Sequence, residues 1–184
     1  MNTMPTEIEK ITTGVALGSI FCFGIFLILD VWNRSFFMQF EGYVSTTSFG
    51  VIAAIPTLAF LYIVGALISL VSDIVFQILS PKGYNREWEL LALVIKKNNE
   101  FFSNTFFELL RKKKILEGSV LPVFTLGIGV GLESQNLTSL KIPLILSGVI
   151  LIVLAIILPL FTDRVQKNME RITKMVYEQD DAKE

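Results

Sequence analysis

The sequence predicts an all-α integral membrane protein, a bundle of four transmembrane helices with amphipathic helices on the cytoplasmic side. Hydrophobic residues make up 52% of the 184 residues and the mean hydropathy is +0.60, which is more apolar than a soluble chain of this length can bury in one core. Four apolar runs are long enough, with their ends, to cross a bilayer core of ~30 Å as helices. Fourteen of the sixteen Lys and Arg residues fall on one predicted side of the membrane. We therefore expect a single membrane domain over residues 1–184.

The first predicted span covers residues 12–32. Its centre is a run of nineteen uncharged residues, Ile11–Leu29, and Trp32 follows at the level where an aromatic ring with a polar edge prefers to lie. We expect this helix to be retained, because no basic segment precedes it and no small-residue cleavage site follows it. Gly14 and Gly18 form a GxxxG pair, which lets two helices approach closely in a membrane. We expect this face to pack against a helix of the same chain or of another copy.

The second predicted span, residues 49–71, lies inside twenty-nine uncharged residues, Val44–Ser72. Pro56 is expected to kink its outer half, because proline lacks the N–H of a helical hydrogen bond and clashes with the preceding turn. We expect the helix to continue past the membrane through Asp73 and to stop at the Ser-Pro-Lys-Gly sequence of residues 80–83.

The segment of residues 81–114 is predicted to lie in the cytoplasm, and it carries eight of the sixteen basic residues. Apolar residues recur there at spacings of three, four and seven, which indicates one face of a helix with a candidate break at residues 98–99. We expect this face to contact protein or lipid rather than water, and its main members are Trp88, Leu91, Ile95, Phe102 and Phe106. The segment ends in a basic tract that consists of Arg111, Lys112, Lys113 and Lys114. We expect this tract to fix the topology, and the alternative is that it forms a specific lipid site.

The third predicted span, residues 115–132, is a helix of ~27 Å, just long enough to cross the membrane. Gly127 and Gly131 repeat the four-residue spacing of the first span, so they too are expected to pack on a helix or on another copy. Residues 125–129 match the T-x-G-x-G spacing of potassium-channel filters. Such a filter enters and leaves on one side of the membrane, which would put the basic tail outside, so we expect a packing face instead.

The fourth predicted span covers residues 142–162 and is rich in Ile and Leu. Residues 163–178 are expected to extend this helix into the cytoplasm, because apolar residues continue there at helical spacing. We expect this stripe to pack on another part of the protein; it consists of Phe161, Val165, Met169, Ile172 and Val176.

The distribution of basic residues predicts the orientation. With both termini in the cytoplasm, the inner side holds Lys10, the eight bases of residues 81–114 and the five bases after residue 162, and the outer side holds only Arg34 and Lys141. This positive-inside bias predicts a multi-pass protein of the cell's inner (cytoplasmic) membrane.

Few residues are suited to chemistry. The chain has no histidine and one cysteine, Cys22, which removes most metal sites and excludes an intrachain disulfide. No nucleotide-binding, metalloprotease or serine-hydrolase motif occurs, so we expect no catalytic residue, cofactor or metal. The net charge of −1 gives no reason to expect a nucleic acid. Asp30 and Asp73 are the acids nearest the spans, but they are predicted ~25–30 Å apart, at opposite ends, and are expected to be interfacial or helix-packing charges.

The leading functional hypothesis is a non-enzymatic, homo-oligomeric membrane protein. It would act as a pore-like or membrane-perturbing element, or as a sensor, together with membrane lipids and a cytoplasmic protein partner. The alternatives are a small-solute transporter or transporter subunit, which would show polar groups at mid-depth, and a lipid-processing or intramembrane enzyme. The general plan of the chain resembles small four-helix membrane subunits of bacterial defence systems, such as the membrane component of Kiwa. This architectural resemblance implies an anti-phage role.

Overall fold

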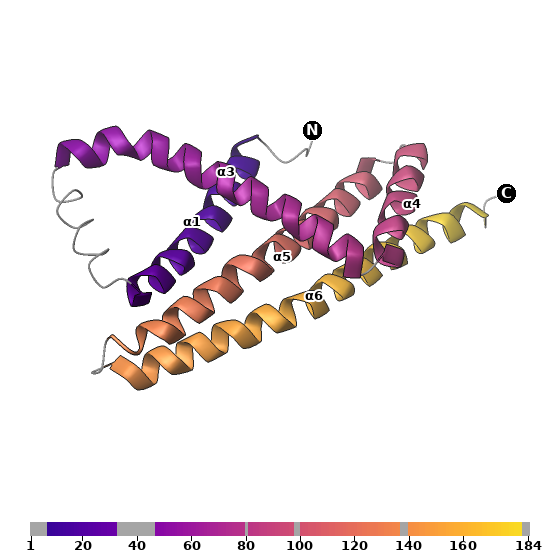
Figure 1. Cartoon of the computed structure of the whole chain (residues 1–184). Coiled ribbons are helices and arrows are strands. Elements are labelled where there is room, and N and C mark those ends of the chain that lie inside the picture. Colours follow the sequence, from indigo (N-terminus) through magenta and orange to yellow (C-terminus); the bar gives the residue numbers. More distant parts are fainter. Residues whose placement is uncertain (1–6, 33–46, 80, 98–99, 137–139, 182–184) are drawn as a thin grey trace.

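The computed structural model describes residues 7–32, 47–79, 81–97, 100–136 and 140–181. These residues form five α-helices and no strand (Figure 1). The helices are α1 (Glu7–Trp32), α3 (Thr47–Leu79), α4 (Pro81–Lys97), α5 (Glu100–Glu133) and α6 (Lys141–Asp181). The all-helical character predicted from the sequence is therefore confirmed for the described residues.

Four of the helices are long and apolar enough to cross a membrane, as predicted. The candidate spans are Glu9–Trp32, Pro56–Ile78, Phe102–Glu133 and Lys141–Met175. The second shares residues 56–71 with the predicted span, and Pro56 is inside α3. Figure 1 shows α3 bent along its length, as expected for a helix that contains proline. The third and fourth candidate spans belong to helices that extend well beyond a bilayer thickness.

Helix α5 is the centre of the arrangement, because it packs against each of the other four helices. On one side, α1 and α3 pack on α5 and on each other. On the other side, α6 runs along almost the whole of α5, and α4 fills the angle between them at the end nearer the C-terminus (Figure 1). In the described part of the chain α6 does not contact α1 or α3, so the four apolar helices form an open layer rather than a closed ring.

Small residues let the apolar helices approach closely. A Cβ atom added to Gly18 of α1 would collide with the backbone of Leu61 in α3, and one added to Gly65 of α3 would collide with the backbone of Gly14. On α5, a Cβ at Gly127 would lie 2.9 Å from the Ile152 side chain of α6. The predicted packing glycines thus lie at contacts between helices of one chain. Close contact of this kind stabilises helix association in a membrane, because the surrounding lipid provides no hydrophobic driving force.

Glycine 131 differs from the other three predicted packing glycines. A Cβ built on Gly131 has no neighbouring atom within 4 Å. Its backbone is nevertheless in contact, because a Cβ on Gly148 of α6 would lie 2.9 Å from the Gly131 Cα. Residues 125–129 are part of the continuous helix α5, which does not form a channel filter. Gly127 faces α6, and a Cβ on Gly129 would lie 2.7 Å from the Gly24 carbonyl oxygen of α1.

A second packing region lies beyond the apolar layer, at the end where α4 crosses α5 and α6. Its buried side chains form one cluster: Leu90 and Val94 of α4, Phe102 and Phe106 of α5, and Met169 of α6. Val165 and Ile172 pack against this cluster, which identifies what the extension of the fourth span packs on. Phe161, at the start of that stripe, is 46% exposed, and the Val176 side chain lies outside the described residues.

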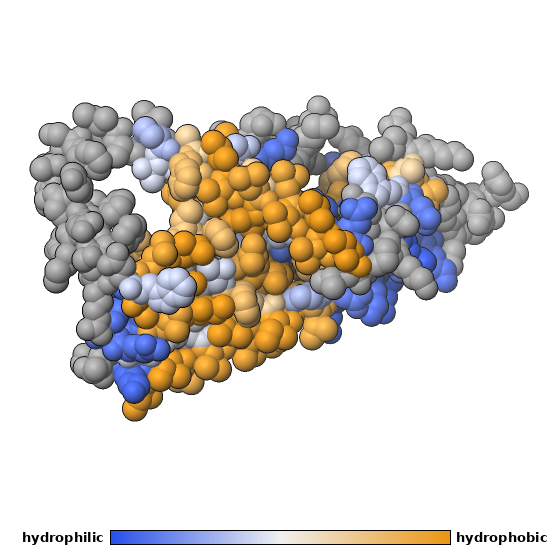
Figure 2. All heavy atoms as spheres, viewed as in Figure 1, coloured by the Kyte–Doolittle hydropathy of each residue, from blue (hydrophilic) through white to orange (hydrophobic). Residues whose placement is uncertain are grey.

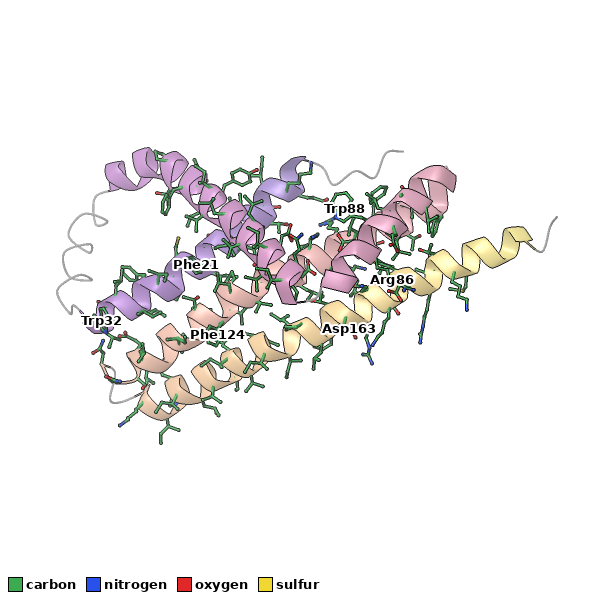
Figure 3. The ribbon with its side chains drawn as sticks, turned by 45° about the vertical axis from the view of Figure 1, so that its right-hand side comes forward. Phe21, Trp32, Arg86, Trp88, Phe124 and Asp163 are labelled. Atoms are coloured by element: carbon green, nitrogen blue, oxygen red, sulfur yellow. The ribbon has the colours of Figure 1, made fainter. Side chains whose placement is uncertain are left out.

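The molecular surface has a broad apolar zone between two hydrophilic ends (Figure 2). Large exposed hydrophobic side chains are concentrated on α3 and α6 and include Leu67, Leu70, Ile150, Ile156 and Leu160. Figure 3 shows Trp32 at one end of the molecule and Trp88, Arg86 and Asp163 towards the other. An apolar zone of this kind is what a bilayer covers, and it supports a membrane-spanning protein.

The glycine contacts predict unequal effects of adding one methyl group. We expect Gly18→Ala to lower the stability of the protein by ~1–3 kcal/mol, because the new Cβ forces α1 away from α3. Gly131→Ala should be neutral or stabilising by up to ~1 kcal/mol, because alanine favours the helix and its Cβ meets no atom. Unfolding in detergent, followed by circular dichroism during a titration with SDS, measures both. Equal losses in the two variants would contradict the described packing.

Candidate functional site

Five charged residues meet where α3, α4 and α5 converge. They are Asp73 of α3, Glu87 of α4, and Lys113, Lys114 and Glu117 of α5, and together they form the charge cluster. The side chains of Lys113 and Glu117 are only 5% and 4% exposed, and that of Glu87 is 10% exposed. Burial of this kind is rare for Lys and Glu, which marks the cluster as the most unusual feature of the described structure.

Ion pairs connect every member of the charge cluster. The Lys113 ammonium donates a hydrogen bond to Glu87 Oε2 and lies 3.6 Å from Glu117 Oε1. The Lys114 ammonium donates to Asp73 Oδ1 at 3.0 Å, and it lies 3.6 Å from Glu87 Oε1 and from Glu117 Oε2. Removing charges from water costs several kcal/mol per ion, so each buried carboxylate needs these ammonium groups beside it.

Local sequence explains why these side chains are buried. Glu87 lies three, four and seven residues before Leu90, Leu91 and Val94, so it shares the face of α4 that packs on the molecule. On α5, Glu117 follows Lys113 by four residues and Lys114 by three, which are the spacings at which helical side chains meet. These two acids were not singled out from the sequence, although an acid on an apolar stripe and an acid spaced for pairing are both recognisable signals.

The basic tract of residues 111–114 is divided between three environments. Lys113 and Lys114 point into the charge cluster, whereas Arg111 donates to Glu9 Oε2 of α1 at 2.9 Å. Lys112 lies on the surface, 59% exposed, with its ammonium 2.7 Å from Glu108 one turn earlier. The tract therefore joins α5 to α1, α3 and α4 and presents one lysine to the surroundings.

The charge cluster lies at the edge of the apolar layer. A Cβ built on Gly118 of α5 would lie 3.1 Å from Leu17 of α1 and 3.5 Å from Ser69 of α3, which fixes the relative positions of the three helices. Lys114 lies one helical turn before Gly118 on α5, and its partner Asp73 is on α3. From Lys114 to the end of α5 is a further nineteen residues, or ~28 Å, close to the thickness of a bilayer core. The cluster is thus at one boundary of the predicted membrane zone.

The predicted apolar face of residues 88–106 is placed unevenly. Phe102 and Phe106 are buried in the cluster with Met169, and Leu91 packs against it. Trp88 is 57% exposed, and the Ile95 side chain lies outside the described residues. Among the described side chains of α4 the buried ones are Glu87, Leu90 and Val94, each one residue before a member of the predicted face.

The acids Asp30 and Asp73 have different surroundings. Asp73 is paired with Lys114, as described above, whereas Asp30 is buried near the opposite end of the apolar layer. Its Oδ1 atom has no hydrogen-bond partner among the described residues. In the described residues no group of three or more acids or cysteines is arranged to hold a metal ion, and this includes the three acids of the charge cluster.

A comparison of the chain with protein-family models, with curated proteins and with solved structures finds no match. The function therefore has to be inferred from the site itself. The charge cluster has no nucleophile beside a base, and its groups are used in pairing each other. Its clear physical effect is to tie together three helices, two of which enter the apolar layer.

The buried pairing predicts a large asymmetry between neighbouring lysines. We expect Lys113→Met to lower the free energy of unfolding by roughly 3–5 kcal/mol, because Glu87 then stays buried without its partner. The double variant Glu87→Met/Lys113→Met should recover most of that loss, since well-packed apolar residues can replace a buried ion pair. The matched control Lys112→Met should change stability by less than ~1 kcal/mol, because its ion pair is exposed. A loss at Lys112 as large as that at Lys113, in the same SDS titration, would show that the cluster does not stabilise the fold.

Proposed function

We propose that the protein is a non-enzymatic membrane protein that works as a homo-oligomer and couples its membrane spans to a cytoplasmic partner. It acts as a pore-like or membrane-perturbing element or as a membrane sensor. The charge cluster is the observation on which this proposal rests. Through it, Glu87 of α4 and Asp73 of α3 are bonded to adjacent lysines of α5, so a displacement of α4 is transmitted directly to two apolar helices.

The proposed orientation places the charge cluster and the C-terminal end of α6 in the cytoplasm. It follows from the positive-inside distribution of the bases, most of which are at the end of the molecule where α4 lies. In this orientation the protein lies in the inner membrane with both termini inside.

The partner-binding part of the proposal is supported by a basic groove between α4 and α6. Its volume is about 430 Å³, and it is lined by Arg86, Lys167, Arg171 and Lys174 together with Glu170. Arg86 and Glu170 form an exposed ion pair with 3.0 Å between Nε and Oε1, which joins the two helices across the groove. A surface with this excess of positive charge favours a partner with acidic groups.

The oligomeric part of the proposal follows from the open layer of helices. Four helices in this arrangement do not surround a channel, so pore-like action requires several copies. The predicted packing glycines are used within the chain, and copies would therefore meet through the exposed apolar faces of α3 or α6. The transporter alternative is less well supported, because the buried charges described here lie near the two ends of the apolar layer.

The orientation predicts a labelling pattern. In a Cys22→Ser background, we expect a cysteine at Gln135, which is exposed beside the end of α5, to react with a membrane-impermeant maleimide in intact cells. A cysteine at Asn168 of α6, which is also exposed, should react only after the membrane is opened. External labelling at residue 168 would reverse the orientation and remove the cytoplasmic partner.

The assembly and the coupling can be tested together. We expect native mass measurements on vesicles of the cell's own membrane to give multiples of 20.7 kDa, and overproduction to depolarise cells loaded with a potential-sensitive dye. Lys113→Met should depolarise cells less, because Glu87 of α4 then loses its partner on α5, whereas Glu87→Met/Lys113→Met should behave more like wild type, because an apolar contact keeps α4 on α5. A monomer that leaves the membrane potential unchanged would remove the pore-like mechanism. Protection of the producing cells from phage infection would test the anti-phage role separately.

A further inference from the structure

A groove between α1, α3 and α5 opens beside the charge cluster. Its volume is about 340 Å³, at the low end of the ~300–1,000 Å³ typical of small-molecule sites. The charged residues that line it come from all three helices and are Glu9, Lys10, Asp73, Arg111 and Lys114. They lie at the edge of the apolar layer, and the rest of the groove extends inward from them.

The inner part of the groove is mostly apolar. It is lined by Leu17 of α1 and by Tyr62 and Ala66 of α3. Tyr62 is eleven residues before Asp73 and Leu17 is eight residues after Glu9, so the groove extends ~12–16 Å along the helices from its charged end. One end therefore matches a polar headgroup at the membrane surface, and the other matches a hydrocarbon chain.

We propose that this groove binds a membrane phospholipid. The phosphate of the headgroup lies at Lys10 and Arg111, and the first part of one acyl chain lies against Leu17, Tyr62 and Ala66. The rest of the lipid covers the exposed apolar side chains that continue this surface on α3, such as Ile63 and Leu67. The proposal concerns a ligand and does not depend on oligomerisation or on a protein partner.

The charges of the groove are complementary to a phosphodiester. Three basic residues, Lys10, Arg111 and Lys114, face two acidic ones, Glu9 and Asp73, so the lining carries one formal positive charge. Arg111 has five N–H donors, and its hydrogen bond to Glu9 comes from Nη1 alone. The side chains of Arg111 and Glu9 are each 42% exposed, which leaves them accessible to a headgroup. Guanidinium is well suited to phosphate, because it can donate two parallel hydrogen bonds.

The apolar half of the groove distinguishes a lipid from free phosphate. A phosphate ion would occupy only the charged end and would leave Leu17 and Ala66 uncovered. An acyl chain covers them with apolar atoms and makes the van der Waals contacts that an empty groove would lack. The shape and polarity of the whole groove therefore favour the complete phospholipid.

Crosslinking on the wild-type protein tests the position of the lipid. A phosphatidylglycerol with a diazirine near the start of one acyl chain is incorporated into nanodiscs with the full chain and then irradiated. We expect crosslinked peptides to be concentrated on α1 and α3 around residues 17, 62 and 66. Crosslinks spread evenly over the exposed apolar faces of α3 and α6 would overturn the proposal, because they would indicate general lipid contact.

Matched variants test the two halves of the groove by native mass measurements of phosphatidylglycerol binding. We expect Arg111→Gln and Ala66→Phe each to weaken binding about fivefold or more, the first by removing a charge and the second by filling the apolar part. Lys112→Gln, which removes the neighbouring charge outside the groove, should leave binding unchanged. Ala66→Phe keeps every charge, so it decides the test if Arg111→Gln does not fold.

Two results of the binding experiment would overturn the proposal. Equal losses in Lys112→Gln and Arg111→Gln would reveal non-specific attraction by the basic tract. Competition by inorganic phosphate or by glycerophosphoglycerol, together with unchanged binding to Ala66→Phe, would show that the groove takes a free phosphate group.

Discussion

The pairing of the buried lysine at position 113 is the interaction on which the arrangement of the other helices depends. Its ammonium is almost fully removed from water, and leaving a buried charge without an opposite charge beside it is strongly destabilising. Glu117 comes from the same helix, but Glu87 comes from α4, so α4 has to cross α5 at this point. The next lysine, Lys114, bonds to Asp73 and so fixes the end of α3 against the same turn of α5.

Two kinds of packing meet at this turn of α5. On one side of it, α1, α3, α5 and α6 approach through glycines, in a zone where their outward faces are apolar. On the other side, α4, α5 and α6 enclose a small core around Phe106 and Met169, as in a water-soluble protein. Because α5 and α6 continue without interruption through both zones, neither zone can move far without the other.

The number and character of the helices could be predicted from the sequence, because hydropathy over twenty residues is a local property. The partners of each helix could not. Gly14 and Gly18 were identified as a packing face, but nothing in their spacing shows that α3 of the same chain, with Gly65, is the neighbour. The ends of the second span are hard to place for a related reason, since a run of twenty-nine uncharged residues is longer than the membrane requires.

The charge cluster shows this limit most clearly. Lys113, Lys114 and Asp73 were recognised as separate features, a topology signal and an interfacial acid, because each is charged and close to an apolar run. Lys114 bonds directly to Asp73, and both lysines pair with Glu87 of α4, whereas the periodicity pointed to its neighbour Trp88. Adjacent positions of α4 have different surroundings here, because Trp88 is 57% exposed whereas Glu87 belongs to a buried ion pair.

The position of α4 also determines how a signal could cross the molecule. It is held on one side by the buried pair of Glu87 with Lys113, and on the other by the exposed pair of Arg86 with Glu170 of α6. Exposed ion pairs contribute ~0–1 kcal/mol, whereas breaking a buried one costs several times more. A partner that binds the basic groove and displaces Arg86 from Glu170 would therefore leave α4 bonded to α5, while Leu90 and Val94 still pack with Met169 of α6. Any movement of α4 would then pass to α5 and, through Lys114 and Asp73, to α3.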